Sequence, residues 1–95
     1  MKRYAVWQEE KQRYEIIRRD LVFENGWYRG EPVQRLGRFE NMFEQLQRER
    51  EQVCLKMEQL RQIGQSRSTD YKRLVARREL LEEMLGYFKI YVGIK

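Results

Sequence analysis

A heptad pattern of apolar residues through the middle of the chain constrains the fold more than any other feature. Apolar side chains recur there at steps of three and four residues, the spacing of one face of a coiled-coil helix. The stripe has one polar member, Arg50, and consists of Leu36, Phe39, Phe43, Leu46, Arg50, Val53, Met57 and Leu60. Pro32 suits a first helical turn and Gly64 a C-terminal stop. We therefore predict a helix over residues 33–63, about 46 Å long.

The last part of the chain repeats this pattern. One stripe consists of Leu74, Arg78, Leu81, Leu85, Phe88 and Val92, and an adjacent stripe consists of Leu80, Met84, Tyr87 and Tyr91. Ser68, Thr69 or Asp70 can cap the start of a helix, and Gly93 can end it. We therefore predict a second helix over residues 70–92.

A short loop between two such helices gives an antiparallel, coiled-coil-like helical hairpin. With the loop at residues 64–69, the predicted facing pairs are Leu60 with Leu74, Val53 with Leu81, and Leu46 with Phe88. In this register Arg50 lies near Glu83, and Arg78 lies near Glu58. An arginine in each apolar stripe is typical of a residue that fixes the register of two helices.

The first part of the chain allows two interpretations. Tyr14, Ile17 and Leu21 form a helical stripe, which predicts a helix over residues 3–23. The alternative is a β-hairpin, because Asn25-Gly26 lies between aromatic and branched residues. Whether residues 14–29 are helix or β-hairpin stays open at this point.

These segments predict an all-α fold class and one small helical domain over residues 1–95. Residues 1–31 form an N-terminal helix or arm and a turn, and residues 32–95 form the helical hairpin. The arm is expected to pack at the open end of the hairpin. Long amphipathic helices of this kind often complete their core with another subunit.

Composition argues against catalysis and against a bound metal or cofactor. The chain has no histidine, so Ser-His-Asp catalysis and imidazole ligands are excluded. Cys54 is the only cysteine and cannot form an internal disulfide or a thiolate zinc site. Its free thiol fits a reducing compartment, so we expect a cytoplasmic protein. We also expect no membrane span and no small-molecule substrate, because no long uncharged stretch and no catalytic constellation is present.

Aromatic residues cluster at the two ends of the sequence. Eleven of the twelve lie in residues 1–43 or 87–95, and Tyr71 is the exception. A helical hairpin brings these two stretches to one end, which we call the aromatic pole. Tryptophan and tyrosine are enriched in interfaces. The predicted partner-binding residues are Trp7, Trp27, Tyr28, Phe39, Phe43, Tyr87, Phe88 and Tyr91.

Positive charge is concentrated at the loop between the two predicted helices. The net charge of the chain is +5, and residues 64–78 carry five basic groups against one acidic group, Asp70. Cations in a first helical turn oppose the helix dipole, and an anion would relieve that conflict. The candidate phosphate or nucleic-acid contacts in this basic tip are Arg67, Ser68, Lys72, Arg73 and Arg77.

Two functions follow from these features. The leading hypothesis is a non-enzymatic interaction or adaptor protein, which binds a protein partner or itself through the aromatic pole and the apolar helix stripes. The alternative is an accessory nucleic-acid-binding subunit of a nucleoprotein complex, which contacts phosphates through the basic tip at residues 64–78. Such contacts would carry little sequence specificity.

Overall fold

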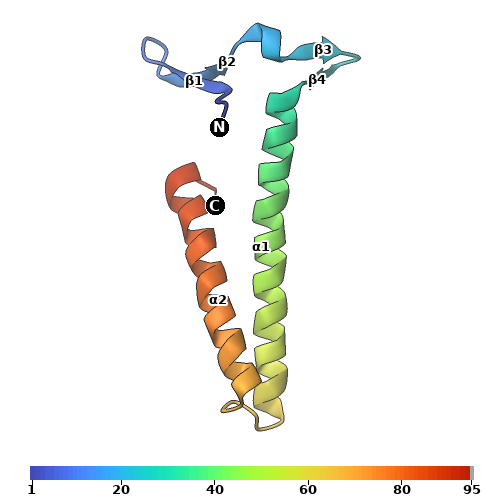
Figure 1. The fold of residues 1–95 in the computed structure, drawn as a ribbon, viewed down its shortest axis with the longest axis vertical. Coiled ribbons are helices and arrows are strands. Elements are labelled where there is room, and N and C mark those ends of the chain that lie inside the picture. Colours follow the sequence, from blue (N-terminus) through green and yellow to red (C-terminus); the bar gives the residue numbers. More distant parts are fainter. Residues whose placement is uncertain (95) are drawn as a thin grey trace. The chain divides into compact units, whose positions relative to one another are not determined.

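A computed structural model describes residues 1–94 and combines four short strands with two helices (Figure 1). Their order along the chain is β1 (Ala5–Gln8), β2 (Arg13–Ile16), the 3-10 turn η1 (Arg18–Asp20), β3 (Val22–Glu24), β4 (Trp27–Arg29), α1 (Glu31–Gln62), α2 (Thr69–Tyr87) and the π-helix η2 (Phe88–Val92). The chain divides into two compact units, Met1–Glu40 and Asn41–Lys95. We call them the N-terminal unit and the helical unit; the first turns of α1 belong to the N-terminal unit.

The predicted all-α fold class is wrong, because residues 3–23 form no α-helix. β1 and β2 instead form an antiparallel pair in which Ala5 lies opposite Ile16 and Trp7 opposite Tyr14. Aromatic and β-branched side chains of this kind favour strands. The molecule is therefore mostly helical, with two additional two-stranded antiparallel sheets.

The second hairpin forms around Asn25-Gly26, as the alternative interpretation of this segment proposed. β3 and β4 pair with Phe23 opposite Tyr28. Asn25 has a φ of 53° and Gly26 a φ of 84°. Positive φ at both central residues defines the type I′ turn, whose twist matches that of the flanking strands.

Gly30 joins this hairpin to α1 in a tightly packed corner. Its φ is 140°, and a Cβ placed on it would lie 2.3 Å from the backbone oxygen of Asp20. Only a residue without a side chain fits there. The chain then enters α1, where Pro32 occupies the first turn and is buried.

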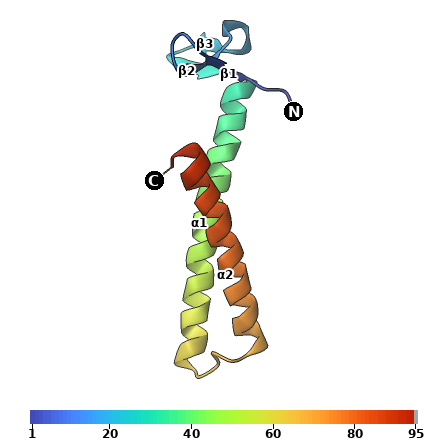
Figure 2. The same cartoon turned by 90° about the vertical axis from the view of Figure 1, so that its left-hand side faces the viewer.

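The two helices lie close to the predicted ranges 33–63 and 70–92. α1 ends in the predicted loop, where the Gln65 N–H donates to the Leu60 carbonyl over 2.8 Å. Ser68 caps α2, because its hydroxyl accepts a hydrogen bond of 3.1 Å from the Tyr71 N–H. Within the helical unit, α1 and α2 run antiparallel and side by side (Figure 2).

Apart from Pro32, the buried apolar residues of the described chain all belong to the helical unit and to the predicted heptad stripes. They are Phe43, Leu46, Val53 and Met57 from α1, Leu81 and Leu85 from α2, and Phe88 from η2. Met57 is 1% exposed and Leu81 0%, and the rings of Phe43 and Phe88 are 5.3 Å apart. The seam between the two helices is thus the core of this unit.

The last turn departs from the predicted α-helix. Residues Phe88–Val92 form a π-helix, and Gly93 ends it with a φ of 76°. A π-turn bonds residue i to residue i+5 and so shifts the faces on which side chains lie. Val92, which the heptad pattern predicts on the seam, is exposed.

Candidate functional site

An apolar row on α2 and η2 lies beside the filled seam; three of its four members are exposed, and Met84 is half-buried. We call it the α2 stripe; it consists of Leu80, Met84, Tyr87 and Tyr91. Leu80 is 46% exposed, Tyr87 52% and Tyr91 79%. The rings of Tyr87 and Tyr91 lie 6.0 Å apart, so the row continues into η2. The helical unit therefore buries one apolar face of α2 and leaves a second face uncovered.

Tyr87 also forms a hydrogen bond through its hydroxyl. Its hydroxyl donates a hydrogen bond of 3.1 Å to the Glu83 carboxylate one turn earlier. The bond and the negative charge of Glu83 raise the pKa of Tyr87, so the phenol stays protonated. An oriented tyrosine with an apolar ring and a polar tip is typical of protein interfaces.

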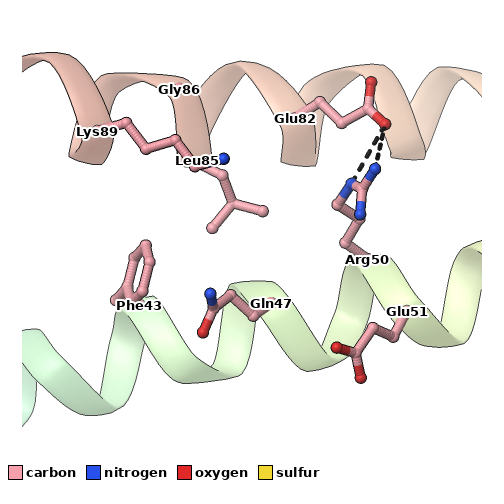
Figure 3. A pocket seen from close by; sticks show the side chains of 8 residues that line it. All are labelled: Phe43, Gln47, Arg50, Glu51, Glu82, Leu85, Gly86 and Lys89. Atoms are coloured by element: carbon pink, nitrogen blue, oxygen red, sulfur yellow. Dashed lines mark hydrogen bonds and ion pairs between the residues drawn. The ribbon is translucent and has the colours of Figure 1, made fainter. Parts of the chain in front are cut away.

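A groove of about 290 Å³ lies between the two helices (Figure 3). Phe43 and Leu85 point into it, and Gly86 leaves space beside them. Arg50 crosses the groove and donates two hydrogen bonds, of 3.2 and 3.1 Å, to one oxygen of Glu82. Lys89 and Glu51 complete a mixed-charge rim, which holds no nucleophile paired with a base.

Two ion pairs connect α1 with α2. Arg50 pairs with Glu82, one residue from the predicted Glu83, and Arg77 pairs with Glu49 over 2.7 Å. The hydrogen bond from Arg77 lowers the pKa of Glu49, and a hydrogen bond from Gln45 adds to the effect. Both pairs are exposed at the helix edges, so they fix register more than they add stability.

The predicted aromatic residues come from both units. Trp7 packs edge-on against Tyr14 at 5.1 Å and donates its indole N–H to Glu9 over 2.7 Å. Tyr28 packs against Phe23 at 4.9 Å. The N-terminal unit holds Trp7, Trp27, Tyr28 and Phe39, and the helical unit holds Phe43, Tyr87, Phe88 and Tyr91.

These aromatic residues differ in how much surface they offer. Trp27, Tyr28, Tyr87 and Tyr91 are exposed, whereas Phe43 and Phe88 are buried in the seam. A buried seam residue supports the helix pair and offers no surface to a partner. Whether the exposed members form one aromatic pole stays a prediction.

The residues of the predicted basic tip are partly engaged within the chain. The Ser68 hydroxyl caps α2 and donates to the Gln65 carbonyl over 2.8 Å. Arg77 is paired with Glu49, and Arg73 lies 4.0 Å from Asp70. Arg67 and Lys72 are exposed and form no ion pair within residues 1–94. The phosphate-binding prediction thus depends mainly on these two cations.

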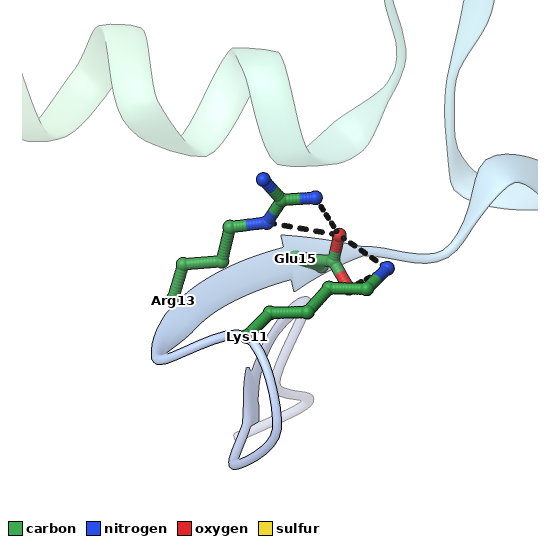
Figure 4. A network of polar contacts seen from close by, with 3 residues as sticks. All are labelled: Lys11, Arg13 and Glu15. Atoms are coloured by element: carbon green, nitrogen blue, oxygen red, sulfur yellow. Dashed lines mark hydrogen bonds and ion pairs between the residues drawn. The ribbon is translucent and has the colours of Figure 1, made fainter.

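A small charge network stands on the first hairpin of the N-terminal unit. The Glu15 carboxylate accepts from Arg13 over 3.0 Å and from Lys11 over 3.5 Å (Figure 4). The Arg13 hydrogen bond lowers the pKa of Glu15, and the charge of Lys11 acts in the same direction. The network joins the turn before β2 to β2 itself, because Lys11 lies in the turn and Arg13 and Glu15 lie on the strand.

In the part of the chain that the structure describes, no group of three or more Cys, Asp or Glu residues could hold a metal ion. The Cys54 thiol is free and half-buried on α1. No helix among residues 1–94 has the length and apolar character needed to cross a membrane.

Comparisons with protein families, with curated proteins and with solved structures find no match to this chain.

Sequence reasoning missed one contact that shapes the N-terminal unit. The Arg35 guanidinium on α1 stacks over the ring of Tyr4 at 4.5 Å and donates to the Lys2 carbonyl. These residues are far apart in sequence, and no local pattern joins them. The α2 stripe, by contrast, was visible in the three- and four-residue spacing of its members.

Proposed function

We propose that the protein is a non-enzymatic interaction module whose helical unit assembles through the α2 stripe. The preferred occupant of the stripe is the same stripe on a second copy, which would extend the helix pair into a small coiled-coil-like bundle. A different protein with an apolar helix is the other form of this adaptor function. The free thiol of Cys54 leads us to include a cytoplasmic location in the proposal.

One observation carries the proposal: α2 has two apolar faces and the seam covers only one of them. Leu81 and Leu85 are buried against α1, while Leu80, Tyr87 and Tyr91 face solvent. From Leu80 to Tyr91 the stripe extends over about 16 Å, or three helical turns. Exposed apolar rows of this kind mark protein–protein contact sites more often than isolated apolar residues do.

Sedimentation velocity of the full chain over a range of concentrations tests the proposal. We expect a dimer or larger assembly that Leu80→Ser and Tyr91→Ser dissociate. Leu55→Ser is the matched control, because Leu55 is 60% exposed on α1 and lies outside the stripe. Far-UV circular dichroism establishes that each variant keeps its helices.

A monomer at every concentration would eliminate self-assembly. Equal dissociation by Leu55→Ser would eliminate the α2 stripe as the contact surface. In the first case, a heterologous helix would remain as the occupant to be sought.

The second candidate function, an accessory nucleic-acid-binding subunit, is favoured by one observation. Arg67 and Lys72 project from the basic tip without a carboxylate partner among residues 1–94. Electrophoretic mobility shifts with non-specific DNA and RNA at low salt test it. We expect binding that weakens steeply with salt and is lost in the double variant Arg67→Glu, Lys72→Glu. Absence of binding at low salt would remove this candidate.

A further inference from the structure

The N-terminal unit contains a groove that neither proposed function uses. Its volume is about 440 Å³, and it lies where the start of the chain and the end of β2 approach the first turns of α1. Its apolar lining includes Ile16, Pro32, Leu36 and Phe39, and its cations are Arg3 and Arg35. Pro32, Leu36 and Phe39 share one face of α1, because they follow the spacing of a helical stripe.

The two arginines of this groove have no carboxylate partner. Arg3 donates through Nε to the Ala5 carbonyl over 2.7 Å, and Arg35 donates to the Lys2 carbonyl. Neither forms an ion pair within residues 1–94, and no acidic residue lines the groove. A guanidinium has five N–H donors, so each arginine keeps donors for a further acceptor.

Several acidic groups of the N-terminal unit are committed elsewhere. Glu15 pairs with Arg13 and Lys11, Glu24 with Arg29, and Glu31 with Arg38. The carboxylates of these three residues are therefore paired with cations other than Arg3 and Arg35. No carboxylate of residues 1–94 lines the groove, so a ligand with a carboxylate would supply the complementary group.

We propose that this groove binds a peptide segment in which apolar side chains alternate with Asp or Glu. The apolar side chains would pack against Ile16 and Leu36, and a carboxylate would accept hydrogen bonds from Arg3 or Arg35. Arg35 is already oriented by its stack on Tyr4, which reduces the entropy lost when it binds a carboxylate.

Exposure favours a peptide over a small amphiphile such as a fatty acid. Leu36 is 57% exposed and Ile16 39%, so the groove is open to solvent along these residues. Sites for small molecules usually bury most of the ligand surface. An open groove with an apolar floor and a cationic rim instead matches an extended amphipathic peptide, whose apolar side chains face the floor and whose alternate acidic side chains reach the rim.

Fluorescence anisotropy of a labelled synthetic peptide tests the proposal on the full chain. The probe is a short peptide of alternating leucine and glutamate, and the control peptide has lysine in place of glutamate. We expect Arg35→Gln to weaken binding about ten- to hundredfold and Leu36→Ser to weaken it about tenfold. Arg19→Gln is the matched control, because it removes one positive charge from the same unit outside the groove.

Preference for the acidic peptide, with losses confined to the two groove variants, supports the proposal. Equal binding of the lysine peptide, or an equal loss with Arg19→Gln, overturns it. Absence of binding by the acidic peptide, whether or not oleate binds, also overturns it. Leu36→Ser tests the groove independently if Arg35→Gln fails to fold, because the Leu36 side chain is exposed and its replacement should leave the fold intact. The result does not depend on whether the helical unit self-associates.

Discussion

Replacing Gly30 with alanine tests how the N-terminal unit is held together. Two effects add at this position. A φ of 140° is rarely adopted by residues with side chains, and such backbone strain costs about 1–3 kcal/mol. The new Cβ would also lie 2.3 Å from the Asp20 oxygen, where ordinary contacts begin at 3.4 Å. Forced overlap of this kind costs about 1–3 kcal/mol more.

Gly26→Ala is the matched control, because it isolates the first effect. Gly26 has a φ of 84°, and no atom lies within 4 Å of the position its Cβ would take. Alanine there costs about 1–2 kcal/mol of left-handed strain, of which about 0.4–1 kcal/mol is offset by the lower entropy of the unfolded chain. Strain and the entropy offset act in both variants, so we expect Gly30→Ala to lower the free energy of unfolding by about 1–3 kcal/mol more than Gly26→Ala does, which is the cost of the overlap.

Urea unfolding followed by tryptophan fluorescence measures this difference. Trp7 and Trp27 are the only tryptophans of the chain, and both lie in the N-terminal unit. The internal control is the urea unfolding curve followed by far-UV circular dichroism, which the helices dominate. This curve should differ little between the native chain and the two variants. Equal losses of free energy of unfolding in the two variants would refute the close packing of Gly30 against Asp20.

Three further predictions concern the helical unit. Leu81→Ala should lower the free energy of unfolding by about 2–5 kcal/mol, because Leu81 is 0% exposed; a loss below about 1 kcal/mol in urea unfolding, less than an Ile→Val change can cost, would contradict its place in the core. Ser68→Ala removes the cap of α2 and should cost about 0.5–2 kcal/mol, whereas Ser68→Asp should restore most of it in thermal melts. The pKa of Glu49 is lowered by the hydrogen bond from Arg77, so its contribution to stability is present above the ordinary carboxylate pKa and is lost as pH falls through the lowered value. The difference in free energy of unfolding between the native chain and Glu49→Gln should therefore shrink in acid, and a difference that is constant with pH would contradict this.

The helices could be predicted because their apolar side chains pack on each other within one seam. A seam of two helices imposes its heptad period on both sequences, and Phe43, Val53, Leu81 and Phe88 are buried where that period places them. At Arg50 the observed register differs from the predicted one by a single residue, Glu82 in place of Glu83. The short loop between the helices leaves little room for them to slide along each other. The π-turn after Tyr87 has no period of its own and was missed.

The N-terminal strands could not be predicted in the same way. β1 has half-buried residues at its two ends, Ala5 and Gln8, and exposed residues between them, so it shows no alternation of apolar and polar positions. The short helical spacing of Ile17 and Leu21 was therefore the stronger signal. Only Asn25-Gly26 marked a hairpin, because its turn needs positive φ whatever the strands pack against. The groove at Arg35 depends on contacts across the fold and left no local pattern.

The distribution of buried side chains has a consequence for the lifetime of the chain. The buried residues of the core lie in the helical unit, and Pro32 is the one buried residue of the N-terminal unit. Segments with few buried contacts open locally at low cost and are the first to be cleaved by proteases. A ligand that binds only the folded form at a hundred times its Kd adds about 2.7 kcal/mol of stability. Occupancy of the groove would then slow proteolysis of the N-terminal unit, so that chains bound to their partner outlast free ones.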